Sequence, residues 1–220
     1  VGQSMSAIYG TGYKRAPDGQ IVYGEDGYPL LADDLIYLGD SNPKGKGSFG
    51  TEIKYKGISL NILFDGQFGG KGYSFTNAML MEHGKHEKTL SGRYNGIIGD
   101  GVIENPDGTY RKNDVVAEEI WTYYTRHGGR ENLEGSMFNT DFLKLRELTL
   151  SYSFPARICK KIGMRKLSVG IYGRDLFMIT NWPAFDPEFG TLNNGTIDKG
   201  FEIAQFPATR NFGVKLNIEF

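Results

Sequence analysis

The sequence has 220 residues, of which 39% are hydrophobic and 23% are charged, and its formal net charge is -1. These values are those of an ordinary folded protein, and the near-neutral charge offers no concentrated basic face, so we exclude nucleic-acid binding. No apolar run approaches the roughly 18 residues that a transmembrane helix needs, and the single cysteine, Cys159, excludes an intrachain disulfide.

The first part of the chain predicts a loop followed by a β-hairpin. Residues 1–46 are rich in turn formers, so we expect at most a short hairpin near residues 20–23. Apolar and polar side chains then alternate over residues 49–55 and 58–64, which predicts two strands. Only Lys56 and Gly57 separate them, so the strands are antiparallel and joined by a tight turn.

Residues 67–141 break the strand pattern and predict a long connection with two short helices. The first helix contains Phe75 and Leu80 and ends at Gly84, and the second contains Ile120 and Tyr124 after Asn113 as its N-cap. Between them, residues 82–87 hold two histidines and two glutamates, whose spacing matches no closed set of four metal ligands. We therefore expect a solvated loop there.

Strand patterns return in the last third of the chain. Leu148 and Leu150 alternate with polar residues, but Leu143 and Leu145 lie in the opposite phase, which predicts a bulge near residues 146–147. After Pro155 we expect a basic turn over residues 156–164, a strand over 166–178, a loop over 180–207 and a closing strand over 208–220 that pairs with the strand before it. The turn formers of that last loop include Gly190, Asn194 and Gly195.

The apolar sides of these strands need a cover, which is either a second sheet or lipid. Long and short connections alternate, which favours a membrane barrel with short turns at one rim and long loops at the other. Five strands are too few to close a barrel, which needs about 8, so we expect further strands to complete it. The expected lipid-facing residues share one face: Ile58, Leu60, Ile62, Phe64, Leu148, Leu150, Tyr152, Leu167, Val169, Ile171, Val214, Leu216, Ile218 and Phe220.

Several ordered motifs resemble SusC/RagA-type TonB-linked outer-membrane proteins. They are NTDFLKLRELTLSYSFP at 139–155, IGMRKLSVGIYGRDLFMIT at 162–180, FDPE at 185–188 and the Phe-ended last strand, with GYKRAPDG at 12–19, LGDSNP at 38–43 and FDGQFGG at 64–70. One departure is Arg174-Asp175, where the family reads closer to Gln-Asn, and we expect no consequence for the fold.

The resemblance implies an all-β membrane protein. Residues 1–220 then form the C-terminal portion of a large antiparallel transmembrane β-barrel of about 22 strands, while the plug domain and the N-terminal strands lie outside this sequence. Residues 67–141 and 180–207 are expected to be long extracellular loops containing short helices.

The resemblance also implies a function, a location and partners. They are TonB-dependent import of a large nutrient, a glycan or a peptide, across the Gram-negative outer membrane. The partners are a SusD-like surface lipoprotein, TonB through a region N-terminal to this sequence, and outer-membrane lipid; no cofactor is implied. The alternative is a secreted β-sandwich, a carbohydrate-binding module or adhesin, with its site in residues 67–141.

Aromatic residues supply the candidates for ligand contact: Trp121, Tyr123, Tyr124 and Trp182. The alternative is that Trp121 and Tyr124 anchor a helix to the rest of the protein. We identify no catalytic set, because the acidic pairs at residues 33–34 and 118–119 are typical of solvated faces and no nucleophile has a suitably spaced base. We therefore expect no enzyme activity.

Overall fold

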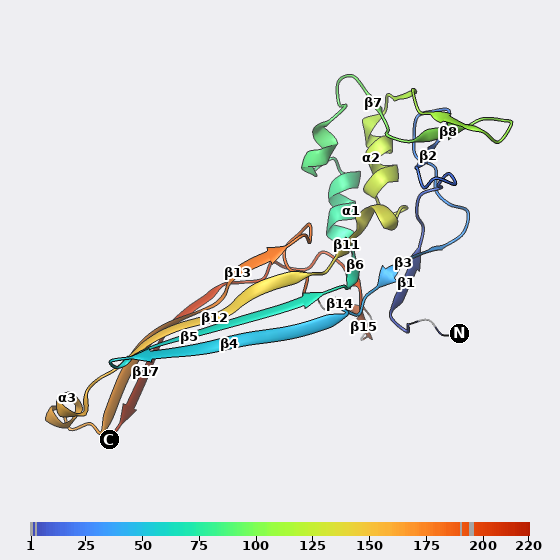
Figure 1. Ribbon diagram of the computed structural model, residues 1–220. Helices are drawn as coiled ribbons and strands as arrows, with labels where there is room; N and C mark the ends of the chain where they lie inside the picture. Colours follow the sequence, from blue (N-terminus) through green and yellow to red (C-terminus); the bar gives the residue numbers. More distant parts are fainter. Residues whose placement is uncertain (1, 3, 190, 194–195) are drawn as a thin grey trace. The chain divides into compact units, whose positions relative to one another are not determined.

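A computed structural model describes residues 2, 4–189, 191–193 and 196–220 (Figure 1). The predicted turn residues Gly190, Asn194 and Gly195 lie outside this description. The chain divides into two compact units. The sheet unit comprises Pro43–Gly69, Thr140–Asn181 and Pro207–Phe220, and the mixed unit comprises Val1–Asn42, Gly70–Asn139 and Trp182–Phe206.

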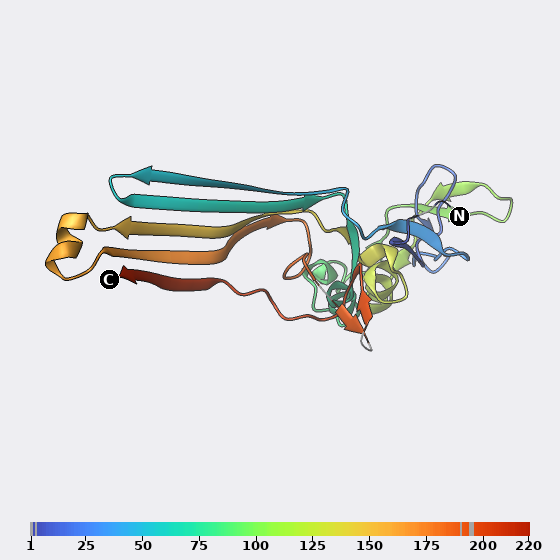
Figure 2. The same ribbon diagram turned by 90° about the horizontal axis from the view of Figure 1, so that it is seen from below.

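The sheet unit is one antiparallel sheet of five long strands. Its strands are β4 (Gly45–Tyr55), β5 (Ile58–Phe68), β12 (Phe142–Ser153), β13 (Lys166–Thr180) and β17 (Asn211–Glu219). Their order across the sheet is β17-β13-β12-β5-β4, and Figures 1 and 2 show them side by side. The predicted hairpin and the predicted pairing of the closing strand with its predecessor are confirmed.

The turn between β4 and β5 depends on two residues with positive φ. Lys56 has a φ of 47° and Gly57 a φ of 89°, the combination of a two-residue hairpin turn whose twist matches that of the flanking strands. A Cβ at Gly57 would lie 2.8 Å from the carbonyl oxygen of Ser153, which is too close. The Gly57 carbonyl in turn accepts a hydrogen bond of 2.8 Å from the Ser153 N–H. The turn therefore requires glycine at this position.

The predicted bulge in β12 is confirmed at Arg146. The register shifts between Leu145 and Glu147 against both neighbouring strands, so Arg146 is the extra residue of the bulge. The extra residue returns Leu145 to the phase of Leu148, because strand side chains alternate between faces with a period of two. Leu145 consequently pairs with Phe64 on the apolar face.

The Arg146 side chain binds two carboxylates of the neighbouring strands. Its Nη2 lies 2.8 Å from Asp65 Oδ2 and its Nη1 lies 3.1 Å from Asp175 Oδ1. Asp175 has a φ of 51°, which an aspartate tolerates better than most residues. Asp175 therefore belongs to this irregularity of the sheet.

The register places the expected lipid-facing side chains of the five strands on one face. The pairs are Ile58 with Tyr152, Leu60 with Leu150, Ile62 with Leu148, Leu150 with Ile171, Tyr152 with Val169, and Leu167, Val169 and Ile171 with Ile218, Leu216 and Val214. Phe49, Ile53 and Tyr55 of β4 extend the same face. Many of these side chains are exposed to solvent, with 72% of Val214, 60% of Leu216 and 60% of Ile171 accessible. Within the sheet unit, the described strands form a single sheet, whereas a sandwich requires a second sheet over this face.

The basic turn after β12 is a short helix rather than irregular chain. Helix α3 (Ala156–Lys161) begins after Pro155, whose fixed φ suits a helix start. Its Cys159 is buried, with Sγ 3.6 Å from the Phe154 carbonyl oxygen. No helix in the described part of the chain is long and apolar enough to span a membrane.

The mixed unit contains short strands and helices from three separate stretches of the chain. Its elements are β1 (Ala7–Gly10), β2 (Val22–Tyr23), β3 (Ile36–Asp40), β6 (Lys71–Ser74), α1 (Phe75–Glu82), η1 (Glu87–Leu90), β7 (Ile97–Ile98), β8 (Val102–Glu104), β9 (Tyr110–Lys112), β10 (Val116–Ala117), α2 (Ile120–Gly128), η2 (Glu134–Ser136), β11 (Met137–Asn139), β14 (Thr191–Asn193), β15 (Thr196–Asp198) and β16 (Phe201–Glu202). Its main core joins Tyr23, Met81, Ile103, Ala117, Tyr123 and Tyr124.

Two expectations for this unit were wrong, and one was confirmed. Residues 1–46 are not a loop throughout, because β1 and β3 form an antiparallel pair. The expected short hairpin near residues 20–23 is confirmed, because Arg15 and Ile21 form an antiparallel bridge and the Val22 N–H donates to the Lys14 carbonyl at 2.9 Å. Val22 and Tyr23 also pair in parallel with β8. Asn113 does not cap α2, whose N-cap is Glu119; the Asn113 side chain is buried and donates to the Gly99 carbonyl at 2.9 Å. In the two wrong cases residues more distant in sequence supply the partner, which local patterns do not reveal.

Candidate functional site

A pocket of about 330 Å³ lies in the mixed unit, between the end of α1, the η1 turn and the start of α2. Its lining residues are Met81, His83, Gly84, Thr89, Arg93, Ile120, Trp121 and Tyr124. Two of the four aromatic residues singled out from the sequence, Trp121 and Tyr124, therefore meet in one pocket. Apolar and aromatic walls with a few polar groups are typical of small-ligand sites.

Helix α2 directs its aromatic residues to different sides. Trp121 is 60% exposed, whereas Tyr123 and Tyr124 are only 7% exposed and belong to the core. Tyr124 also donates a hydrogen bond of 3.1 Å from its hydroxyl to the Ser91 carbonyl oxygen, which holds the η1 turn against the helix. Because Tyr124 is fixed by packing and Trp121 is open, the pocket has a rigid floor and one accessible aromatic ring.

The Arg93 side chain holds residues 84–89, which contribute polar groups to the pocket lining, in place by hydrogen bonds. Its Nε donates to the Thr89 carbonyl oxygen at 2.8 Å, and its Nη2 donates to the Gly84 carbonyl at 2.7 Å and to Thr89 Oγ1 at 3.0 Å. Gly84 has a φ of 63°, the conformation that commonly ends a helix. The guanidinium thus places a fixed positive charge beside the aromatic rings.

His83 contributes the second polar group of the pocket. It is the C-cap of α1, and its Nδ1 lies 2.8 Å from the Met79 carbonyl oxygen. A carbonyl oxygen only accepts hydrogen bonds, so this contact places the proton on Nδ1 and leaves Nε2 as an acceptor in the neutral ring. The site therefore offers a hydrogen-bond donor, Arg93, and an acceptor, His83 Nε2, next to the exposed indole of Trp121.

Buried carboxylates fix both ends of α1. Glu202 of β16 is fully buried and accepts hydrogen bonds from Ser74 Oγ, Thr76 N and Thr76 Oγ1 at 2.8, 3.2 and 2.6 Å. A carboxylate at a helix N-terminus also interacts favourably with the helix dipole. At the other end Glu82, which we expected in a solvated loop, is buried and lies 2.9 Å from Arg130 Nε; that expectation was wrong.

His127, near the end of α2, lies among three tyrosines. Its Nδ1 is 3.1 Å from Tyr13 Oη, its Nε2 is 3.2 Å from Tyr23 Oη, and its ring packs on Tyr123 with centroids 4.4 Å apart. Burial lowers the pKa of His127 from 6.5 to about 4, because desolvation penalises the imidazolium. Burial likewise raises the pKa of the Tyr13 and Tyr23 phenols. The cluster is therefore neutral at pH 7.

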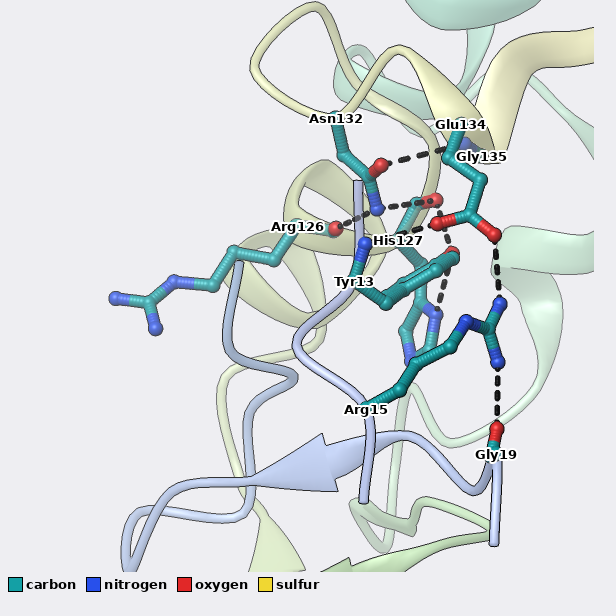
Figure 3. Close-up of polar contacts among 8 residues, drawn as sticks. All are labelled: Tyr13, Arg15, Gly19, Arg126, His127, Asn132, Glu134 and Gly135. Carbon is teal, nitrogen blue, oxygen red and sulfur yellow. Dashed lines mark hydrogen bonds and ion pairs between the residues drawn. The ribbon is translucent and has the colours of Figure 1, made fainter. Parts of the chain in front are cut away.

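Figure 3 shows the polar contacts that link Tyr13 and Arg15 to residues 126–135. Glu134 accepts a hydrogen bond from the Tyr13 backbone N–H at 2.9 Å and forms an ion pair of 2.6 Å with Arg15. Tyr13 also donates from its hydroxyl to the His127 carbonyl oxygen at 2.6 Å. Asn132 donates to the Arg126 carbonyl oxygen at 2.9 Å. These contacts position α2, and with it Trp121, relative to the other segments of the unit.

Trp182, the fourth sequence candidate, lies away from the pocket lining. It is 6% exposed, stacks on Phe189 with centroids 5.0 Å apart and meets Phe138 edge to face at 6.1 Å. The structure thus brings Trp121 and Tyr124 into the pocket and places Tyr123 in the core behind it. The pocket residues Arg93 and Thr89 were not found from the sequence, because isolated polar residues in a long connection carry no periodic signal. His83 was considered there only as a metal ligand.

Comparison with known proteins places the whole chain within one group. No family model matches the sequence. The chain is 25% identical to TonB-dependent receptor P3 of Formosa agariphila over 100% of the chain and 22% of that protein. It is 24% identical to TonB-dependent receptor P39 of the same organism over 86% of the chain and 17% of that protein.

The fold matches solved structures of the RagAB peptide transporter. One superimposes with a TM-score of 0.63 at 17% identity, covering 97% of this chain and 23% of that chain. A second, of the importer in its closed-closed state, gives a TM-score of 0.62. The chain therefore spans 17–23% of the length of these relatives.

The long antiparallel sheet with one apolar exposed face belongs to a fold that this chain shares with these transporter structures. The whole chain is similar to TonB-dependent receptors, which are proteins of the Gram-negative outer membrane.

Proposed function

We propose that this chain forms C-terminal strands of a transmembrane barrel of about 22 strands that imports a large nutrient by a TonB-dependent mechanism. Glycans and peptides are the cargo classes, and a SusD-like surface lipoprotein assists uptake. The observation that carries the proposal is the aligned apolar face of the sheet unit, because soluble proteins rarely expose so large a continuous apolar surface.

The polarity of the opposite sheet face also supports a barrel. Asn61 pairs with Thr149 and Thr149 with Tyr172, while Ser151 pairs with Ser59 and Gly170. Outer-membrane strands alternate between lipid-facing apolar residues and polar residues that face the lumen. We assign the mixed unit, which contains the long connections, to the extracellular side. The short turns at Lys56-Gly57 and α3 then face the periplasm.

We assign the pocket of Trp121 and Tyr124 to cargo contact. An exposed indole stacks on the apolar face of a sugar ring or on an aromatic peptide side chain, and Arg93 and His83 supply polar contacts beside it. Other outer segments of the full receptor and the lipoprotein complete the binding surface.

A pair of neighbouring substitutions in β17 tests the membrane assignment. Leu216 pairs with Val169 on the apolar face, and Asn217 pairs with Ser168 on the other. The free energy of unfolding is measured by urea titration of the full-length receptor folded into phosphatidylcholine vesicles. We expect Leu216→Arg to lower it by about 2–4 kcal/mol, the cost of an arginine on the lipid face near the bilayer midplane, and Asn217→Arg to lower it little. Equal effects at the two positions would refute the lipid-facing assignment.

The cargo role is tested with Trp121→Ala in the full-length receptor with its lipoprotein. Tyr94→Ala is the matched control, because Tyr94 is a 98% exposed aromatic residue of the same unit outside the pocket. With one panel of defined oligopeptides and one of defined oligosaccharides, we expect Trp121→Ala to weaken binding of one panel about fivefold or more and Tyr94→Ala to leave it unchanged. Unchanged binding of both panels by Trp121→Ala excludes the pocket from cargo contact.

A further inference from the structure

Helix α3 and the residues after it form a strongly basic end of the sheet unit. Arg157, Lys160, Lys161, Arg165 and Lys166 lie within ten residues, and no acidic residue occurs between Glu147 and Asp175. Glu219 of β17 lies 3.4 Å from Arg165 and 2.9 Å from Lys166. The other three cations form no ion pair within the described ranges of the chain.

The helix has an inner side, a basic side and an exposed apolar side. Cys159 is buried against Phe154, which fixes the side that faces the sheet unit. At 100° per residue, the three cations of residues 157–161 fall on one side of the helix. Ile158 and Ile162 fall on the next side, where they are 46% and 51% exposed. A helix with adjacent basic and apolar sides is suited to a lipid surface.

The surroundings of α3 follow the order expected at the edge of a membrane. Leu167 and Val169 belong to the apolar face of the sheet. Tyr152 pairs with Val169, and the Phe154 N–H donates to the Leu167 carbonyl oxygen at 2.9 Å. These two rings, which meet edge to face at 5.0 Å, therefore lie at the level of the last apolar residues before the short turn. The strands thus end in a mixed apolar and aromatic level, and the basic residues of the turn follow it, as they do where protein passes from hydrocarbon to headgroups.

We propose that α3 docks on the phospholipid surface at the short-turn rim, with its basic side bound to the phosphates of anionic headgroups. Ile158 and Ile162 enter the boundary between headgroups and acyl chains, and Arg157, Lys160 and Lys161 donate to phosphate oxygens. Charge complementarity selects this occupant, because the exposed side carries three cations and no acid. The inference rests on the proposed membrane barrel.

The test uses full-length receptor in a neutral detergent, titrated with phosphatidylglycerol or phosphatidylcholine and read by native mass spectrometry. The test variant is Arg157→Gln/Lys160→Gln/Lys161→Gln. The matched control is Lys85→Gln/Lys88→Gln/Lys112→Gln, which removes three exposed cations from the mixed unit. A second variant, Ile158→Ser/Ile162→Ser, removes the apolar side and keeps the charges.

We expect the wild type to bind phosphatidylglycerol more tightly than phosphatidylcholine. The test variant should lose on the order of 10- to 100-fold in phosphatidylglycerol affinity, and the control variant should match the wild type. The serine variant should bind both lipids several-fold more weakly. Arg157→Lys, which keeps the charge, should retain binding and so separates charge from folding.

Three results would overturn the proposal: an unchanged phosphatidylglycerol affinity in the test variant, an equal loss in the control, or displacement of the lipid by inorganic phosphate at the same concentration. The last result would mark a site for free anions. Cargo binding and vesicle insertion are measured on the same proteins. A variant that inserts and binds cargo but keeps its lipid affinity refutes only the docking of α3, whereas failure of the wild type to insert refutes the barrel.

Discussion

His127 makes the stability of the mixed unit depend on pH. The folded-state pKa of His127 is about 4, and an unfolded histidine titrates near pH 6.5. The fold therefore favours the neutral ring, so its contribution is fully present above pH 6.5 and is lost progressively as pH falls from 6.5 to 4. Linkage gives a loss of about 2 kcal/mol at pH 5 and about 3 kcal/mol below pH 4. These are upper values, because the side chain is only partly buried.

Hydrogen exchange measures this effect in the full-length receptor. Amide protection over residues 120–128 is followed at pH 7, 6 and 5, corrected for the chemical exchange rate, with β12 as the internal reference. We expect protection in α2 to fall by the equivalent of about 2 kcal/mol between pH 7 and 5. The strands of the sheet unit should change much less, since His127 belongs to the mixed unit.

His127→Gln is the control, because glutamine keeps a donor and an acceptor but does not titrate. His83, His86 and the carboxylates remain in both proteins, so their contributions cancel in the comparison. The variant should be less stable at pH 7 and should lack most of the additional loss at pH 5. A variant with the same pH dependence as the wild type would show that His127 is not the titrating group.

Two further predictions concern single residues that hold each unit together. Glu202→Ala leaves the hydroxyls of Ser74 and Thr76 without their acceptor, so we expect a loss of about 2–4 kcal/mol in α1 protection by hydrogen exchange. Glu202→Gln keeps one acceptor oxygen and should lower α1 protection less than Glu202→Ala does. Equal losses of protection in the two variants would count against the role of the carboxylate. Gly57→Ala should destabilise the receptor by about 1–3 kcal/mol in urea, because its φ is 89° and its Cβ meets the Ser153 carbonyl. Gly47→Ala in the same hairpin, where a Cβ has nothing within 4 Å, should cost markedly less; a larger loss there would contradict the turn argument.

The sequence by itself determined the sheet unit. Alternation with a period of two marks each long strand, and the two residues between β4 and β5 allow only an antiparallel hairpin. The reversed phase of Leu143 and Leu145 located the bulge at Arg146 before any partner strand was known. These features are local, because the side-chain period and the turn length are properties of neighbouring residues.

The candidate site was only partly predictable. Trp121 and Tyr124 stand out by residue type, and the structure places both in the pocket. Their neighbours Arg93 and His83 become part of the site only when η1 packs on α2 through contacts such as Tyr124 to Ser91. Whether an aromatic residue is open, as Trp121 is, or buried, as Tyr123 is, depends on which side of α2 faces the core.

Only the tertiary structure decided that the long connections fold as a unit of their own. The core of this unit joins Tyr23, Ile103 and Tyr124, and the Tyr13 to His127 contact spans 114 residues. No local pattern encodes such pairings, since each short segment has too few apolar residues to signal its partner. The strands of the sheet unit follow from the chain's own periodicity, whereas the mixed unit exists because three separate stretches bury apolar and polar groups against one another.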